Sequence, residues 1–259
     1  MKNLQDLITP GHYARTQVLS KDRVIAWSHR SRFMLARQLV EPYAGGRLLD
    51  YGCGEGTFLA LVHDLFANAA GTDANADEIA KCRERFAAKP GVEFVIVDKL
   101  KDEYHGGAFK VVCCFEVLEH CTESVAGEVL YELRRLVADD GRVIISVPIE
   151  TNLSLVGKQV VRALAQWRGH RGQRETYRFG EFCKMVLARE GTAIERPLRS
   201  AVSDSGTYSY HGHKGFNWRT MRRRLDGPFV VERICFSPLG RLGALVGSQA
   251  WFVCSPRPY

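Results

Sequence analysis

RLLDYGCGEGTFL, from Arg47 to Leu59, holds three glycines at alternate positions between an apolar run and the start of an apolar helical pattern. This order predicts a strand, a tight turn and a helix N-terminus. Glycine permits positive φ and leaves room for a ligand beside the backbone. The free N–H groups and partial positive charge of a helix N-terminus favour polar or anionic ligand atoms. We therefore expect a nucleotide-like cofactor at this turn.

The spacing of the glycines bears on which cofactor binds. A dinucleotide fingerprint reads G-x-G-x-x-G, but its third glycine position is Thr57 here and the extra glycine is Gly56. The acid Asp50, two residues before the first glycine, would repel a pyrophosphate but suits the cationic end of S-adenosylmethionine. The run resembles motif I of the class I S-adenosylmethionine-dependent methyltransferases. An NAD-dependent oxidoreductase stays open as the alternative.

Strand and helix patterns alternate after the glycine turn. We expect strands at 69–73, 92–97, 109–115 and 142–147, with a turn at 139–141, and helices at 58–66, 77–87 and 124–137. Two further strands, 229–236 and 249–254, are predicted to close the sheet as a hairpin-like pair. Alternating strands and helices predict βαβ units, a parallel sheet and ligand binding beyond the carboxyl ends of its strands.

Acidic residues follow the predicted strands where a cofactor needs them. Asp73 closes the second strand and Asp98 the third, and the fourth runs into F-E-V-L-E-H at 115–120. From Gly46 to Pro148 this series is similar to the core of a class I methyltransferase of type 11 or 12. The resemblance implies a Rossmann-like, mostly parallel seven-stranded sheet with helices on both faces and an antiparallel last strand.

The same resemblance assigns cofactor contacts. Motif I would hold the methionine and ribose side, Asp73 and Ala74 the ribose hydroxyls, Asp98 and Lys99 the adenine, and Glu116 and Val117 the region of the sulfonium. The motif I residues in this set are Asp50, Gly52, Cys53, Gly54 and Gly56. A helix over 21–41 would bring an arginine to the cofactor carboxylate, so residues 1–45 are expected to cap the cofactor. A cationic helix face that only contacts solvent is the alternative.

Methyl transfer from a sulfonium depends mainly on alignment, since orientation alone supplies about 7–11 kcal/mol. A base helps when the acceptor is a hydroxyl. His120 is the first candidate because its side chain titrates near neutrality and it follows the fourth strand, with His211 and His213 as second candidates. A hydrogen-bonded structural role for His120 is the alternative. His211 and His213 have no carboxylate or third histidine nearby in sequence, so no metal site is expected.

Residues 150–226 are expected to form an inserted substrate cap on a core of 46–149 and 227–259. Tyr208, Tyr210 and Trp218 would line the acceptor pocket there, and Arg171 and Arg174 would recognise an anionic acceptor. The alternative for the aromatic stretch is a simple loop anchored by Phe216 and Trp218. Solvated surface charge is the alternative for the arginines. The cap resembles bacterial methyltransferases of surface glycans and lipid-linked products. We therefore expect O-methylation of a small or glycan-like acceptor, with an anionic or lipid-linked one left open.

The length, net charge and pI of the chain limit the classes of molecule that it can bind. The chain has 259 residues, a net charge of +7 and a sequence pI near 9.0, which fits an acidic substrate, a membrane surface or nucleic acid. An RNA methyltransferase is the alternative, but the N-P-P-Y tetrapeptide common in enzymes that methylate base amino groups is absent. A non-catalytic binding module is disfavoured because the acids and glycines of the cofactor pocket are present.

No apolar run reaches the roughly 20 residues of a transmembrane helix. No signal peptide is evident, and the eight cysteines form no C-x-x-C pair, so we expect a cytoplasmic protein. The helix Leu153–Arg168 is apolar on one side and basic on the other, which is compatible with contact at the anionic inner face of a membrane. The oligomeric state stays open.

Overall fold

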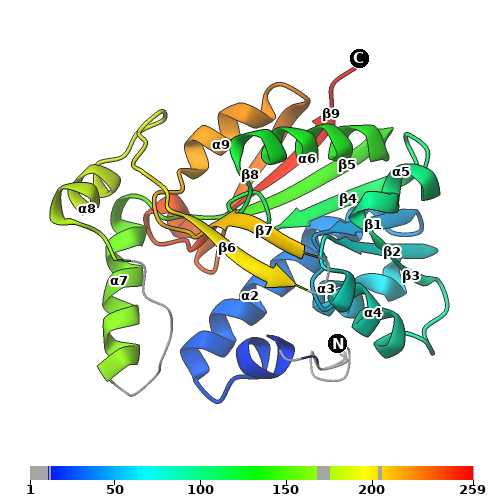
Figure 1. Cartoon of the computed structure of the whole chain (residues 1–259), viewed down its shortest axis with the longest axis horizontal. Helices are drawn as coiled ribbons and strands as arrows, with labels where there is room; N and C mark the ends of the chain where they lie inside the picture. Colours follow the sequence, from blue (N-terminus) through cyan, green and yellow to red (C-terminus); the bar gives the residue numbers. More distant parts are fainter. Residues whose placement is uncertain (1–10, 12, 168–175, 204–205, 259) are drawn as a thin grey trace.

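The computed structural model of the chain describes residues 11, 13–167, 176–203 and 206–258. Its main feature is a seven-stranded sheet with the order β3-β2-β1-β4-β5-β9-β8, and a separate pair, β6-β7, lies outside it (Figure 1). The strands of the main sheet are β1 (Arg47–Tyr51), β2 (Asn68–Asp73), β3 (Val92–Ile96), β4 (Phe109–Phe115), β5 (Val137–Pro148), β8 (Phe229–Ser237) and β9 (Gln249–Pro256). The separate pair consists of β6 (Leu198–Ser203) and β7 (Gly206–His211).

Strand directions match the expected sheet. Strands β1 to β5 pair in parallel, whereas β9 runs antiparallel to both β5 and β8. The predicted Rossmann-like sheet with an antiparallel last strand is therefore confirmed. The strand order reverses between β1 and β4, and such a switch point is where open α/β sheets bind their ligands.

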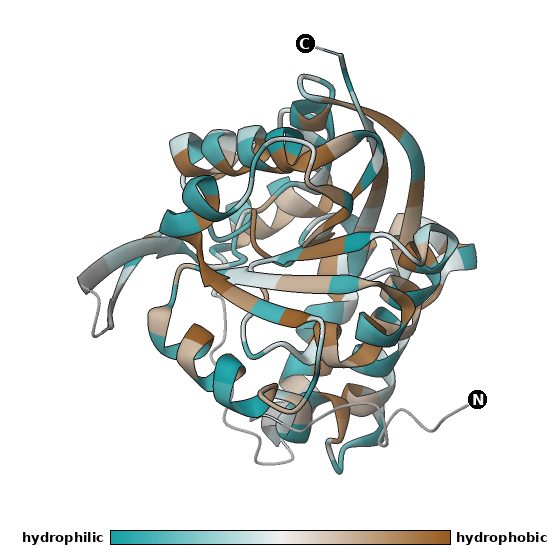
Figure 2. Cartoon of the chain, turned by 90° about the vertical axis from the view of Figure 1, so that its right-hand side faces the viewer, coloured by the Kyte–Doolittle hydropathy of each residue, from teal (hydrophilic) through white to brown (hydrophobic). Residues whose placement is uncertain are grey.

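Helices cover both faces of the sheet, and two more lie outside it (Figure 1). They are α2 (Arg23–Val40), α3 (Thr57–Val62), α4 (Ala76–Arg85), α5 (Leu100–Glu103), α6 (Glu123–Leu136), α7 (Asn152–Trp167), α8 (Phe179–Val186) and α9 (Trp218–Leu225), of which α7 and α8 are the two that Figure 1 shows outside the sheet. One buried cluster joins the sheet to α6 and α9, and a second joins its other face to α2, α3 and α4. Figure 2 shows hydrophobic residues along the strands and hydrophilic ones on the outer helices. Two apolar layers thus hold the sheet, as burial of apolar surface requires.

Two details differ from the sequence-based expectation. The turn predicted at 139–141 lies within β5, where the pairing of β4 with β5 shifts register between Phe109 and Val111. The extra residues of β5 are accommodated as a bulge, so the strand continues through them. The pairing of β6 with β7 was not predicted, because no strand was expected directly before or within the aromatic stretch that begins at Tyr208.

Helix α7 leaves several of its apolar residues outward. Val160, Val161 and Trp167 are exposed, whereas Lys158 and Arg162 turn inward to the buried carboxylate of Glu150, at 2.8 and 3.3 Å. An amphipathic helix usually buries its apolar stripe, but α7 fully buries Leu155 and leaves these three side chains exposed. Among the described residues, no helix has the length and apolar character needed to cross a membrane.

Candidate active site

The glycine turn has the predicted form. Gly52, Gly54 and Gly56 adopt φ values of +80°, +50° and +74°, which side chains other than glycine rarely adopt. The N–H groups of Gly52 and Cys53 donate to the carbonyl oxygen of Thr72, at 2.8 and 2.9 Å. Helix α3 begins directly after Gly56. The turn is therefore tied to the end of β2 and directs the α3 N-terminus beyond the sheet edge.

Asp73, the last residue of β2, contacts this turn through its carboxylate. Its Oδ2 accepts from Gly54 N at 3.0 Å and its Oδ1 from Asn75 N at 2.9 Å. Each oxygen keeps a further acceptor site, because a carboxylate oxygen has two lone pairs. A Cβ built on Gly54 would meet nothing within 4 Å, so the space beside the turn is open. Open space beside the turn, next to a carboxylate held by two hydrogen bonds, fits a nucleoside whose ribose hydroxyls donate to Asp73.

Asp50 and Cys53, also assigned to the cofactor, are buried beneath the turn. Burial, together with the nearby Asp73 carboxylate, raises the pKa of Asp50 to about 8. Asp50 therefore retains its proton at pH 7, and a neutral carboxyl here avoids an unpaired buried charge. The expected attraction between an ionised Asp50 and the cationic end of the cofactor is thus not provided by the ligand-free protein.

A cleft of about 1350 Å³ opens beyond the ends of β1, β2 and β4. Nine of the predicted site residues line it: Gly52, Asp73, Ala74, Asp98, Glu116, Val117, His120, Tyr208 and Tyr210. Lys99 is exposed beside the cleft, and Lys101 lines it instead. The assignments of individual side chains to cofactor atoms stay predictions.

Glu116 combines backbone strain with a charge partner. Its φ is +57°, which is uncommon for a residue with a side chain and often marks a functional position. Its Oε1 accepts from Ser146 Oγ at 3.2 Å, and its Oε2 lies 3.7 Å from Arg32 Nη1. Arg32, which also donates to the Tyr13 hydroxyl, is thus the α2 arginine nearest the predicted sulfonium region.

His120 stands at the rim of the cleft with a defined tautomer. Its Nδ1 lies 2.8 Å from the carbonyl oxygen of His211, and the N–H of His211 donates back to the carbonyl of His120 at 2.9 Å. Because a carbonyl only accepts, the neutral ring carries its proton on Nδ1. Its Nε2 therefore keeps a lone pair. The β7 strand thus fixes the ring through backbone atoms.

Glu119 is a component that sequence reasoning missed. It is fully buried, and neither carboxylate oxygen has a hydrogen-bond partner among the described residues. Its Oε1 lies 3.8 Å from His120 Nε2 and 3.9 Å from His213 Nε2. Burial, together with the Glu116 carboxylate, raises the pKa of Glu119 well above its usual range. The E-V-L-E-H run contained the signal, since its second glutamate adjoins the predicted base.

His213 lies between Glu119 and Glu150, the buried carboxylate that α7 contacts through Lys158 and Arg162. Its Nδ1 lies 3.9 Å from Glu150 Oε1, and burial lowers its pKa to about 4 although Glu150 opposes the shift. Burial also opposes ionisation of Glu150, but Lys158 and Arg162 outweigh it and hold its pKa below the usual range. His213 is therefore neutral at pH 7 and a weak base, which disfavours it as the group that removes a proton from the acceptor.

The same cluster bears on metal binding. One ligand atom each from Glu119, His120 and His213 lies within 4.8 Å of the others, a grouping that could hold a metal ion. Sequence spacing did not suggest it because the third group comes from the distant segment after β7. The prediction of a site without metal is therefore left untested.

The other predicted substrate and catalytic residues lie elsewhere. The His211 ring is 3.3 Å from the Pro197 carbonyl oxygen and does not line the cleft. Trp218, expected in the acceptor pocket, is a core residue whose ring packs against Phe236 and Phe252. Its size and apolar ring are better satisfied in the core than at a pocket wall. Arg171 and Arg174 lie outside the described residues.

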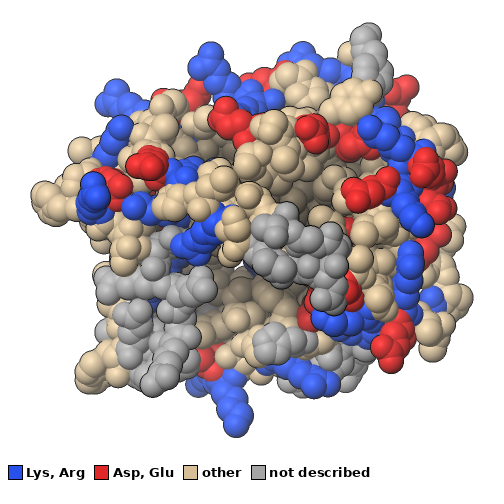
Figure 3. All heavy atoms as spheres, in the orientation of Figure 1, with Lys and Arg blue, Asp and Glu red and all other residues tan. Residues whose placement is uncertain are grey.

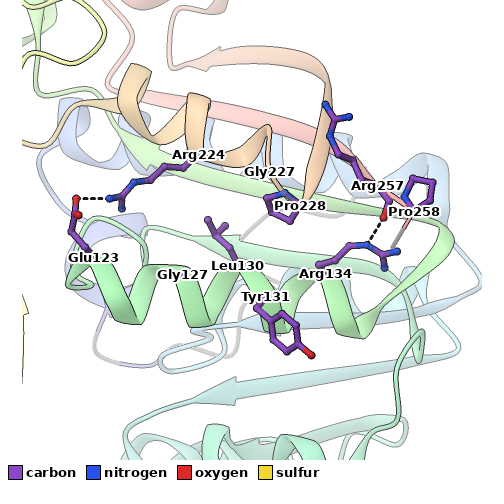
Figure 4. Close-up of a pocket in the computed structure, with 10 residues that line it drawn as sticks. All are labelled: Glu123, Gly127, Leu130, Tyr131, Arg134, Arg224, Gly227, Pro228, Arg257 and Pro258. Carbon is purple, nitrogen blue, oxygen red and sulfur yellow. Dashed lines mark hydrogen bonds and ion pairs between the residues drawn. The ribbon is translucent and has the colours of Figure 1, made fainter.

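A second cavity, of about 500 Å³, lies between α6, the loop before β8 and the C-terminal segment (Figure 4). Arg224 pairs there with Glu123, and Arg134 Nε donates to the Arg257 carbonyl oxygen at 2.7 Å. These arginines are engaged by the protein itself. The cavity contains none of the glycine-turn residues, so the larger cleft is the candidate active site.

The sheet order, the glycine turn and the carboxylate closing β2 together define the class I methyltransferase fold. The sequence model of the family described as "Methyltransferase domain" matches residues 26–182. Because this match covers more than half of the chain, the protein belongs to that family. The predicted class and its cofactor, S-adenosylmethionine, are confirmed at the level of the family.

Curated relatives agree with this class. The "Ubiquinone biosynthesis O-methyltransferase" of Cronobacter sakazakii is 34% identical over 105 residues, which are 39% of this chain and 42% of that protein. The protein of the same name from Thiobacillus denitrificans is 28% identical over 178 residues, 65% of this chain and 71% of that one. The chain thus spans about half the length of the first curated relatives that it matches.

Solved structures support the fold alone. The PH0226 protein of Pyrococcus horikoshii superposes with a TM-score of 0.61 at 18% identity, covering 96% of this chain and 100% of that one. A Burkholderia thailandensis 1,6-didemethyltoxoflavin-N1-methyltransferase, solved with its acceptor and S-adenosylhomocysteine, gives 0.53 at 15% identity, with coverage of 95% and 86%.

Proposed function

We propose that this protein transfers a methyl group from S-adenosylmethionine to a hydroxyl of a small-molecule acceptor. Family membership supports methyl transfer, and curated relatives named as O-methyltransferases favour oxygen as the accepting atom. The observation that carries the proposal is the cleft at the sheet switch point, with Asp73 on one side and His120 at its rim.

The chain's own residues have three tasks in this mechanism. The glycine turn and Asp73 bind the nucleoside, and Glu116, held by Ser146, faces the region of the positive charge. When bound, S-adenosylmethionine supplies the methyl group from a cationic sulfonium. His120 Nε2 accepts the acceptor's hydroxyl proton, because the hydrogen bond from Nδ1 to the His211 carbonyl leaves Nε2 as the basic atom.

Tyr208 and Tyr210 are proposed to contact the acceptor. Both line the cleft from β7, and the Tyr210 ring centroid lies 6.4 Å from that of His120. Their aromatic faces suit a flat, partly apolar acceptor. A glycan-like, anionic or lipid-linked molecule is the alternative acceptor. We also propose that residues 150–226 form an inserted cap over the acceptor.

RNA is the less favoured acceptor. On the face shown in Figure 3, the Lys and Arg side chains of the described residues are interspersed with Asp and Glu, and these residues form no continuous basic stripe there. A backbone-binding nucleic-acid enzyme needs such a stripe to neutralise phosphates.

Replacement of His120 tests the proposal. In His120→Asn, turnover of small phenolic or catecholic acceptors should fall by about 10²–10⁴-fold because the base is lost. Affinity for S-adenosylhomocysteine, measured by calorimetry, should change less than about threefold, or roughly 0.7 kcal/mol.

His211→Asn is the matched control. It keeps the backbone bonds to His120 and removes a ring that does not line the cleft, so turnover should fall by less than about tenfold. Equal losses in the two variants, or methylation of amines alone, would remove His120 and the hydroxyl acceptor from the account.

A further inference from the structure

The exposed apolar residues of this protein are concentrated on three neighbouring segments. These are α7, α8 with the residue that follows it, and the turn 239–246. Six side chains from these segments, together called the α7 surface, are Val160, Val161, Trp167, Phe179, Leu187 and Leu242, and all are exposed. Trp167, Phe179 and Leu187 are 84%, 85% and 78% exposed. Single exposed apolar residues are normal, but a group of them indicates an interaction surface.

The segments are joined by hydrogen bonds. Ser154 Oγ donates to the Gly247 carbonyl oxygen at 2.6 Å, which ties the start of α7 to the end of the turn. Asn152 Nδ2 donates to the Val186 carbonyl oxygen at 3.1 Å, which ties α7 to α8. Figure 1 shows α7 and α8 together at one end of the molecule, outside the main sheet. The α7 surface is thus one region of the fold.

The orientation of α7 follows from Glu150. This carboxylate is fully buried at the end of β5, and a buried charge needs close partners. Lys158 and Arg162 supply them from one side of α7, so Val160 and Trp167, on the opposite side, face outward. Val161, next to Lys158 on the helix surface, is also exposed. The exposed apolar side is therefore held in place by an ionic network.

Exposed cations accompany the apolar side chains. Lys184 and Arg189 are exposed on and after α8, and Arg241 is exposed in the turn beside Leu242. Glu190, an exposed acid near α8 among the residues that the structure describes, is paired with Arg223 at 3.0 Å. A second copy of the chain docked here would bring like charges together, whereas an anionic lipid surface complements them.

We propose that the α7 surface seats this protein on an anionic lipid bilayer. The apolar side chains lie in the boundary between headgroups and acyl chains, where Trp167 has the amphipathic ring typical of that layer. Lys184, Arg189 and Arg241 meet the anionic headgroups, with their stems along the apolar surface. This is peripheral binding through a side of α7, and it does not depend on the acceptor that the cleft takes.

Vesicle sedimentation tests the proposal. The full chain should sediment at low salt with phosphatidylcholine vesicles that contain phosphatidylglycerol, and much less with phosphatidylcholine alone. The double variant Val161→Asp/Trp167→Asp should lower this partition by at least about tenfold because charges would enter the apolar layer. Val230→Asp, at an exposed position on β8 outside the α7 surface and outside the cleft, is the matched control and should stay within about twofold of the wild type.

The variants must be folded, which circular dichroism and unchanged S-adenosylhomocysteine binding will establish. Absence of wild-type partition, or equal partition of the wild type and the double variant, would overturn the proposal. Sedimentation velocity supplies the other decisive outcome: a wild-type dimer that the double variant dissociates, with no vesicle binding, would assign the α7 surface to a second copy. Neither result alters the proposed methyl transfer, because no acceptor is used.

Discussion

At the scale of single residues, Asp50 shows how burial sets the charge of a motif residue. Its carboxyl is 3% exposed beneath the glycine turn, and its pKa is raised from 3.8 to about 8, first by burial and then by Asp73. Between these two values the folded protein keeps a proton that the unfolded chain releases. Rising pH across this range therefore lowers the free energy of unfolding.

Asp50→Asn removes that pH dependence. The free energy of unfolding of the variant, relative to the wild type, should increase as the pH rises from 3.8 toward about 8. The slope is at most about 1.4 kcal/mol for each pH unit. Urea unfolding of the ligand-free proteins at a series of pH values measures it. A difference that stays constant with pH would show that Asp50 is ionised in the folded state.

Sequence reasoning at this scale could locate a residue whose position depends on its own strand. Asp73 could be placed because it closes β2, and parallel topology brings that end to the ligand edge. The Glu119–His213–Glu150 contacts could not, because they join three segments that are far apart in the chain. Trp218 was wrongly expected at a pocket because an aromatic residue suits a core equally well.

At the scale of elements, the glycines of the turn meet two different requirements: Gly52 allows close packing, and Gly54 leaves space for a ligand. A Cβ on Gly52 would lie 2.2 Å from Val117 Cγ2, so this glycine is needed for packing. A Cβ on Gly54 would enter open space, where the cofactor is proposed to lie. Positive φ makes both substitutions strained, by roughly 1–2 kcal/mol.

Gly52→Ala should therefore destabilise the folded protein more than Gly54→Ala does, by about 1–3 kcal/mol, the cost of overpacking. Gly54→Ala should instead weaken S-adenosylhomocysteine binding by more than its loss of stability accounts for. Thermal unfolding and calorimetry on both variants provide the comparison. The same stability loss in the two, with cofactor affinity intact in Gly54→Ala, would place the ligand away from the turn.

The regular elements of the core were predictable because periodicity and turn residues specify them locally. The outward side of α7 was not. Its pattern says which residues share a side, but only the position of buried Glu150 decides which side faces inward. The β6–β7 hairpin was missed for a related reason. Its pairing, from Leu198 with His211 to Ser203 with Gly206, links segments whose aromatic and polar residues suit a loop as well.

At the scale of the whole molecule, strand order brings the site together. The reversal between β1 and β4 separates their following loops, and the cleft occupies the resulting space. Gly52 comes from one loop and Glu116 and His120 from the other, while β7 reaches across from the region after the parallel strands. The class I resemblance predicted this core, but not the way the hairpin contacts His120.

Calorimetry with S-adenosylhomocysteine and with NAD tests the central claim, that a sulfonium nucleoside binds over the glycine turn with its ribose on Asp73. S-adenosylhomocysteine should bind, and Asp73→Asn should weaken it by more than about tenfold, or roughly 1.4 kcal/mol. NAD should show no comparable affinity. Tight binding of NAD with no response to S-adenosylhomocysteine, or an Asp73→Asn variant that binds as the wild type does, would contradict the account.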